Sequence, residues 1–261
     1  MSKNQKLAFG IDIGGSGIKG APVDLSTGEF TADRVRIPTP EKSTPEAVCE
    51  VIQELLGEFD LPEELPIGVA FPAPIYHGVI PTVANLDDSW AGVNIEELIS
   101  KKIGRRVFAV NDADAAGFAE VAYGAAKNED GVVLLATLGT GIGSALIVDG
   151  VLVPNTELGH LEIDGFDAET RAADSARSRE DLDWALWAAR LQRYFSHVEM
   201  LLSPDLIVVG GGVSKHHEEF LPRLQLRAKI IPAELRNAAG ISGAAAYAAD
   251  RARHERKKNK H

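Results

Sequence analysis

The sequence has a single cysteine, Cys49, and no apolar run that approaches the roughly 20 residues needed to span a bilayer. One cysteine excludes an intramolecular disulfide and leaves a cysteine-based zinc site without its other ligands. Glycines also occur too early in the sequence for the apolar stretch of a secretory signal peptide. We therefore expect a cytoplasmic protein that does not enter a membrane.

Basic residues are scarce relative to acidic ones. The 261 residues include 27 Lys and Arg against 38 Asp and Glu, which gives a net charge of −11. This balance argues against nucleic acid as the main partner. Only the segment 251–261 is basic, and there a solvated, frayed tail is favoured over a binding arm. An anionic substrate would need a local positive patch.

The remaining composition is that of a globular protein, with 45% hydrophobic and 25% charged residues. Apolar runs alternate with segments of helical periodicity, which predicts an α/β fold. Thr44 and Asn94 are placed to cap two of the helices, and Gly104 follows the end of the second. Strands are predicted at 7–13, 67–71, 105–110, 131–138, 144–148 and 205–209, and helices at 45–56, 95–103, 113–124, 181–202 and from about 240.

A short internal repeat suggests that the chain is duplicated. Gly15-Ser16-Gly17-Ile18 and Gly139-Thr140-Gly141-Ile142 match at an offset of 124 residues, and each lies between two predicted strands. On these four residues alone, a chance match between two common turns remains the alternative. If the halves are duplicated, each lobe offers a glycine turn to the space between them, and the two turns would hold a polyphosphate chain from both sides.

The two glycine turns carry the chemistry of an anion site. Backbone N–H groups that side chains do not screen form a nest for phosphate. Neither turn matches a P-loop or a dinucleotide fingerprint. Lys19 follows the first turn and could contact a phosphate, or could face solvent. Asp12 precedes that turn and is placed to hold a hydrated Mg²⁺ ion, or else to stabilise the turn.

Asn111 and Asp112 stand where a predicted strand ends and a helix begins. An aspartate at this position commonly caps the helix. Alternatively, the carboxyl end of a strand directs side chains into a ligand crevice. A carboxylate there can accept the proton of a sugar hydroxyl during phosphoryl transfer, while the neighbouring amide binds the sugar.

Glu157 and His160 are three residues apart, so a helical turn would place them on one side of the chain. Polar groups gathered in this way suit the recognition of hydroxyls. A metal site formed by Glu157, His160 and Glu162 is the rival interpretation, although no cysteine or second histidine is near. The triple glycine Gly210, Gly211 and Gly212 could let a nucleotide base approach the backbone, or could form a plain tight turn.

Five segments together resemble the ROK family of sugar kinases. Their order and spacing match that family over nearly the whole chain, and the stretch around residues 157–169 is most similar to the branch that uses polyphosphate. The segments are DIGGSGIK (12–19), NDADAAG (111–117), LGTGIGSALIVDG (138–150), ELGH (157–160) and IVVGGGVSK (207–215).

The resemblance implies an actin-like, ribonuclease H-like fold with two related α/β lobes, as in other sugar kinases of this kind. Residues 1–110, with the helix from about 240 to 261, would form the small lobe. Residues 111–239 would form the large lobe, with the substrate cleft between the two. A homodimer is usual for the family.

The resemblance also implies roles for individual residues. Asp112 would be the general base. The sugar ligands would be Asn85, Asn111, Glu157, His160 and Glu169. The phosphate-binding residues would be Asp12, Gly14, Gly15, Ser16, Gly17, Lys19, Gly139, Thr140, Gly141 and Gly143, and the nucleotide-binding residues would be Gly210, Gly211 and Gly212.

The implied reaction is phosphoryl transfer from inorganic polyphosphate, and also from ATP, to the 6-hydroxyl of glucose and of mannose. Mg²⁺ would accompany the donor. Many family members bind zinc through a cysteine cluster after ELGH, but residues 161–180 contain no cysteine, so we expect no zinc and a His160 that is free to bind sugar. The pool of basic residues for guiding a long polyanion is Lys19, Arg193, Lys215, Arg227, Lys229 and Arg236.

Several rivals remain for the function, among them a kinase for mannose, fructose or an N-acetylated hexose. An ATP-only hexose kinase would use the same residues. A sugar-sensing ROK repressor would need a DNA-binding segment ahead of the core, and we expect none because the first glycine turn begins by residue 12. An ATPase similar to actin or Hsp70 would keep the glycine turns without a need for Glu157 and His160.

Overall fold

The computed structural model describes residues 6–83 and 87–258, and its contacts divide the chain into two compact units. The first unit comprises the residues up to Ala119 together with those from Ala238 onward, and the second is Glu120–Asn237. This division differs from the expected boundary at residue 110. Strand β5 (Val107–Asn111) belongs to the sheet of the first unit, and α3 (Asp112–Tyr123) continues directly from it, so the division falls within α3.

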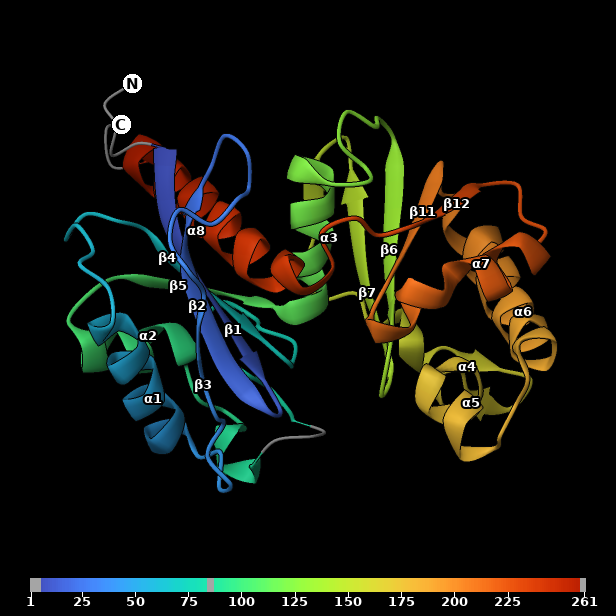
Figure 1. The fold of residues 1–261 in the computed structure, drawn as a ribbon, viewed down its shortest axis with the longest axis horizontal. Helices are drawn as coiled ribbons and strands as arrows, with labels where there is room; N and C mark the ends of the chain where they lie inside the picture. The colour runs from blue at the N-terminus through green and yellow to red at the C-terminus, as the bar shows by residue number, and fades with distance from the viewer. Residues whose placement is uncertain (1–5, 84–86, 259–261) are drawn as a thin grey trace. The chain divides into compact units, whose positions relative to one another are not determined.

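The first unit is a five-stranded mixed sheet with helices on both faces (Figure 1). Its strand order is β3-β2-β1-β4-β5, in which β1, β4 and β5 are parallel and β2 and β3 are antiparallel to their neighbours. The strands other than β5 are β1 (Leu7–Gly14), β2 (Gly17–Asp24), β3 (Val35–Ile37) and β4 (Ile67–Phe71). The strands predicted at 7–13, 67–71 and 105–110 are therefore confirmed.

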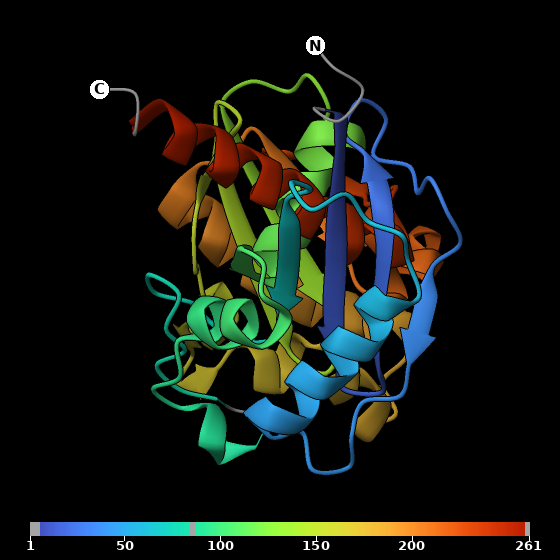
Figure 2. The ribbon, with the colours of Figure 1, turned by 90° about the vertical axis from the view of Figure 1, so that its left-hand side faces the viewer.

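Two helices cover one face of this sheet, which Figure 2 views from their side. Thr44 caps α1 (Pro45–Gly57) by accepting the Ala47 N–H, and Asn94 caps α2 (Ile95–Ile103) by accepting the Glu97 N–H. Gly104 ends α2 at φ 70°, a left-handed conformation that favours glycine. These caps confirm the predicted helix limits.

The opposite face is covered by the C-terminal helix α8 (Ala239–Lys258), which packs on β1, β4 and β5. Glycines allow this helix to lie against the strands at backbone distance. A Cβ atom on Gly10 would overlap the Ile241 carbonyl oxygen, and one on Gly68 would overlap that of Ala244. The two glycines are therefore required by the packing of α8.

The expected frayed tail is wrong for residues 251–258, which continue α8. Side-chain contacts explain this order. Arg251 donates to the Tyr247 hydroxyl at 2.8 Å, and Glu255 forms a 2.8 Å ion pair with Arg106. Basic residues in the last turn also interact favourably with the negative end of the helix dipole.

The second unit repeats the architecture of the first. Its strand order is β12-β11-β6-β7-β8, with β6, β11 and β12 parallel and β7 and β8 antiparallel. Position by position, this is the order and direction of β5-β4-β1-β2-β3. The predicted duplicated α/β fold is confirmed. The strands are β6 (Val132–Leu138), β7 (Ile142–Val148), β8 (Val151–Val153), β11 (Leu206–Gly210) and β12 (Lys229–Pro232).

Helix α6 (Trp184–Leu202) packs on this second sheet and buries Trp187, Leu191, Tyr194 and Phe195 in the core. Smaller elements surround it. These are β9 (Glu162–Ile163), β10 (Phe166–Asp167), α4 (Glu169–Ala172), α5 (Asp174–Arg179) and α7 (His217–Phe220). Within the described residues, no helix combines the length and apolarity needed to cross a bilayer.

We predict that Gly10→Ala lowers the free energy of unfolding by about 1–3 kcal/mol or more, because a methyl group there would collide with a backbone carbonyl that cannot rotate away. Gly57→Ala is the matched control, since a Cβ on Gly57 meets nothing within 4 Å. It should change stability by less than about 1 kcal/mol. Urea denaturation of both variants measures the effect, and equal midpoints would contradict the packing argument.

Candidate active site

In the first unit, the predicted residues gather at the carboxyl edge of the parallel strands. Asp12 lies beside Ala70 in the register of β1 and β4, and Ala70 lies beside Val110 in that of β4 and β5. Asn111 follows at the end of β5, and Asp112 begins α3. Asp12, Asn111 and Asp112 are therefore brought to one edge of a single sheet, where α/β folds bind ligands.

The first glycine turn, Gly14–Gly17, connects β1 to β2 and is flanked by cations. Lys19 lies opposite Asp12 in the hairpin, and its Nζ atom is 3.3 Å from Asp12 Oδ2. Arg36 donates from its guanidinium to the Ser16 carbonyl at 2.5 Å. Sequence reasoning missed Arg36. The register of β2 and β3, which places it beside Lys19, is a tertiary feature without a local motif.

Asn111, rather than Asp112, makes the main capping bonds of α3. Its buried side-chain Oδ1 accepts the N–H groups of Ala113 at 2.9 Å and Asp114 at 3.2 Å. Asp112 is exposed, and its Oδ1 accepts the Ala113 N–H at 2.8 Å. The amide therefore has a structural role, and the exposed carboxylate stands at the positive end of a helix dipole.

In the second unit, the second glycine turn is held by side chains from distant segments. Ile142 N–H donates to Glu169 Oε2 at 3.0 Å, and Ser175 Oγ donates to the Thr140 carbonyl at 2.5 Å. Gly159 lies so close to the Ile142 carbonyl that a Cβ there would overlap it. The predicted residues Glu169 and Gly139–Ile142 are thus brought together, and the ELGH segment packs beside them.

Leu158–His160 forms a short 3-10 helix, and Glu157 stands at its N-cap position. His160 Nδ1 is 2.8 Å from Asp167 Oδ2, and this hydrogen bond is the main cause that raises the pKa of His160 above its ordinary value of 6.5. Asp167 was not predicted. It is an ordinary residue in the sequence, and only the β9–β10 hairpin turns it back toward His160.

The Glu157 carboxyl has a raised pKa. Desolvation raises the pKa of the Glu157 carboxyl, His160 lowers it and Glu169 raises it further. The pKa of the buried Tyr194 hydroxyl is raised mainly by desolvation, and Glu169 raises it further. The negative charge of Glu169, at the start of α4, therefore affects both groups.

One group of side chains in the second unit has the composition of a metal site. Ligand atoms of His160, Asp167 and Glu169 lie within 4.8 Å of one another. Of the rival metal trio considered from the sequence, only His160 belongs to this group. Glu157 and Glu162 do not take part in it.

The remaining predicted residues have mixed outcomes. Gly211 adopts φ 86° and packs on the Leu138 backbone, so these two constraints account for a glycine at this position without a nucleotide. A Cβ on Gly212, by contrast, would meet nothing within 4 Å. In the basic pool, Arg193 is paired with Asp164, and Arg227 donates to the Pro204 carbonyl at 2.9 Å. Asn85 lies outside the described residues.

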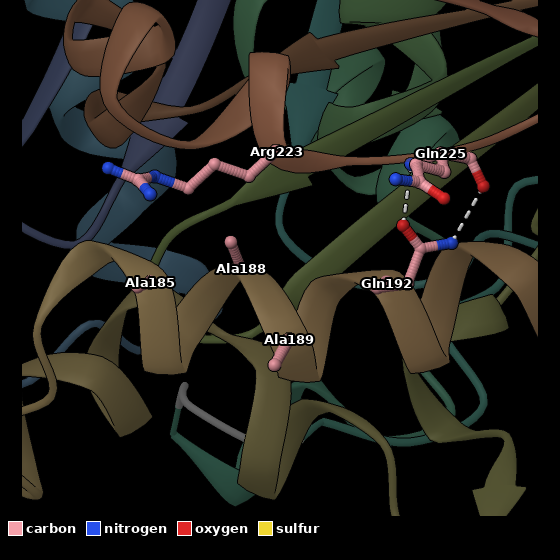
Figure 3. Close-up of a pocket in the computed structure, with 6 residues that line it drawn as sticks. All are labelled: Ala185, Ala188, Ala189, Gln192, Arg223 and Gln225. Atoms are coloured by element: carbon pink, nitrogen blue, oxygen red, sulfur yellow. Dashed lines mark hydrogen bonds between the residues drawn. The ribbon is translucent and has the colours of Figure 1, made fainter.

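A groove of about 470 Å³ in the second unit runs along α6 but contains none of the predicted residues (Figure 3). Its floor is formed by Ala185, Ala188 and Ala189. Gln192 and Gln225 close one end through two hydrogen bonds of 2.9 and 2.6 Å. This groove is therefore separate from the residues that the sequence singled out.

Comparison with known proteins identifies a family. A family model described as the ROK family matches residues 8–175. The polyphosphate glucokinase of Mycobacterium tuberculosis is 47% identical over 242 residues, which cover 92% of this chain and 91% of that protein.

Solved structures agree with this result. An inorganic polyphosphate/ATP-glucomannokinase from Arthrobacter sp. strain KM is similar with a TM-score of 0.86 and 53% identity, over 94% of this chain and 99% of that one. A ROK family glucokinase from Streptomyces griseus, in complex with glucose and AMPPNP, shares the fold at a TM-score of 0.76 and 22% identity, over 94% and 99% of the two chains. The chain described here, with its two duplicated units and their glycine turns, belongs to the ROK family.

Proposed function

We propose that this chain is a kinase that transfers the terminal phosphoryl group of inorganic polyphosphate, and also that of ATP, to the 6-hydroxyl of glucose. The observation that carries the proposal is the close likeness, over nearly the whole chain, to a polyphosphate/ATP-glucomannokinase at 53% identity. Mannose is a second acceptor on the same ground. The geometry of the two units supports the assignment of the chemistry to particular residues.

Asp112 is the general base in this proposal. It accepts the proton of the 6-hydroxyl while that oxygen forms a bond to the terminal phosphorus and the bridging oxygen of the donor leaves. Asn111 keeps its Oδ1 on the two N–H groups at the start of α3. Its side-chain NH₂ group is then oriented to donate to the sugar.

Each glycine turn would bind phosphate through its backbone N–H groups. Lys19 and Arg36 add positive charge at the first turn, which an oligoanion requires in a chain of net charge −11. Asp12 fits a hydrated Mg²⁺ ion, because this ion binds proteins through few carboxylate oxygens and keeps its waters. When bound, Mg²⁺ neutralises charge on the donor phosphates.

Glu157, His160 and Glu169 bind the sugar hydroxyls. Because Asp167 holds Nδ1 of His160, the ring presents Nε2 to the substrate. Because Ile142 N–H occupies Oε2 of Glu169, the sugar would use Oε1. Glu169 would therefore connect the bound sugar to the second glycine turn.

Exclusion of water from the bound sugar would suppress hydrolysis of the donor, because water is a competing acceptor. A cytosolic homodimer completes the proposal. The side chains of Leu186, Met200 and Leu201 on α6 are more than half exposed, and such apolar groups fit a subunit interface.

Separate assays with each phosphoryl donor test the proposed function. Purified protein with Mg²⁺ and glucose should form glucose 6-phosphate from polyphosphate and from ATP, followed through a coupled dehydrogenase. Turnover with ATP alone would make the chain an ATP-only hexose kinase. Donor hydrolysis that glucose does not stimulate would instead favour an ATPase.

We predict that Asp112→Asn lowers kcat by about 10²- to 10⁴-fold while glucose binding changes little, because the amide can still accept the Ala113 N–H but cannot take a proton. Steady-state kinetics and calorimetric glucose binding provide the two readouts. Asp60→Asn removes an exposed carboxylate elsewhere in the unit and serves as the control. More than a tenth of wild-type turnover in Asp112→Asn would exclude Asp112 as the base.

We predict that Asp167→Asn lowers the pKa of His160 toward 6.5, because the acceptor that favours the imidazolium is weakened. The contribution of this interaction to stability is complete at pH values below the ordinary histidine pKa. It is lost as the pH rises through the raised pKa of His160 in the folded protein. NMR titration of the histidine ring measures the change. Asp164→Asn, in the same hairpin but paired with Arg193, should leave the His160 pKa unchanged.

A further inference from the structure

A second cavity in the Glu120–Asn237 unit contains none of the residues proposed for catalysis or substrate binding. It has a volume of about 210 Å³ and lies between the β9–β10 hairpin and helices α4 and α6. Its charged lining comprises three arginines, Arg171, Arg190 and Arg193, with a single carboxylate, Asp164. We call it the arginine pocket.

Arg171 is held in place without a hydrogen-bond acceptor. Its guanidinium carbon is 3.8 Å from the centre of the Phe166 ring, so the two planar groups are in contact. Among residues 6–83 and 87–258, none accepts a hydrogen bond from this guanidinium. Because contact with a ring face leaves the in-plane N–H groups available, Arg171 presents an oriented fork of donors.

The other two arginines are fixed by ion pairs. Arg193 forms a bidentate pair with Asp164, at 2.9 and 2.7 Å. Arg190 donates to Glu180 at 2.5 Å and to the carbonyl of Arg171 at 3.2 Å, a contact that ties α6 to α4. Three guanidinium groups are therefore oriented around one small cavity before any ligand arrives, which lowers the cost of binding an anion.

The buried wall of the pocket has an unsatisfied polar atom. Tyr194 lines the cavity and is 1% exposed, and within the described part of the chain its hydroxyl has no hydrogen-bond partner. Buried hydroxyls are usually paired in folded proteins. The Tyr194 hydroxyl is therefore a hydrogen-bonding group that no described residue uses.

We propose that the arginine pocket binds a small phosphate-bearing anion. Arginine forks match the tetrahedral oxygens of phosphate better than a single charge does. The cavity is smaller than the roughly 300–1,000 Å³ usual for drug-sized ligands, which favours a compact ion. Inorganic phosphate and a hexose phosphate share this chemistry, and the pocket adjoins the hairpin that carries Asp167 and leads to Glu169.

Calorimetric titration of the full chain tests the proposal, with glucose and a non-hydrolysable ATP analogue present to fill the substrate site. Inorganic phosphate and glucose 6-phosphate are titrated separately, and the one that binds shows which phosphate compound the pocket accepts. We expect Arg171→Ala to weaken binding at least about tenfold, the effect of losing one hydrogen-bonded charged group. Phe166→Ala, which removes the platform but keeps Arg171, should weaken it as well.

Arg223→Ala is the matched control, because Arg223 is an exposed arginine of the same unit that lines the other groove (Figure 3). It should bind the anion as the wild type does. Thermal unfolding of each variant shows whether it folds, and Arg171→Lys provides a second variant that keeps the charge but loses the fork. Wild-type affinity in Arg171→Ala, or no binding of either anion to the wild-type chain, would overturn the proposal. The outcome is independent of turnover with either phosphoryl donor.

Discussion

The hydrogen bond from Ile142 N–H to the Glu169 carboxylate is the contact on which the second unit's polar residues depend. It joins the turn after β6 to a segment 27 residues further along the chain. Asp167, two residues before Glu169, accepts the Glu169 N–H at 3.2 Å and also holds His160. One short stretch therefore orients the histidine, the glutamate and the glycine turn together, so a displacement of the hairpin would affect all three.

The same fold is used twice, but its two glycine turns have different electrostatic surroundings. The first is flanked by the cations Lys19 and Arg36. The second is supported by a carboxylate, which already occupies the Ile142 N–H. The two hairpins also close differently, since Gly14 pairs with Gly17 whereas Leu138 pairs with Ile142. Under the proposed function, the first turn neutralises phosphate charge, and the second also positions the sugar through Glu169.

Several arginines of the second unit are committed to partners within it. Arg193, considered from the sequence as part of a track for a long polyanion, is instead bound to Asp164 and faces the arginine pocket. Arg171 differs from Arg193, because Phe166 supports its charge without neutralising it. An acidic protein can therefore keep an anion site where the positive charge is oriented by aromatic contact rather than by carboxylates.

Local patterns in the sequence determined the helices, the strands, their caps and the repeated glycine turn, because periodicity and capping act within a few residues. They also indicated Asp12, Asn111, Glu157 and His160, which stand beside recognisable turns or element ends. Only the tertiary structure revealed Arg36 and Asp167, which reach their partners across a strand register and a hairpin. It also decided that Asn111 caps α3, that the basic C-terminal segment is helical, and that Arg171 of α4 meets two arginines of α6. Such contacts depend on how distant segments pack, and no local pattern encodes that packing.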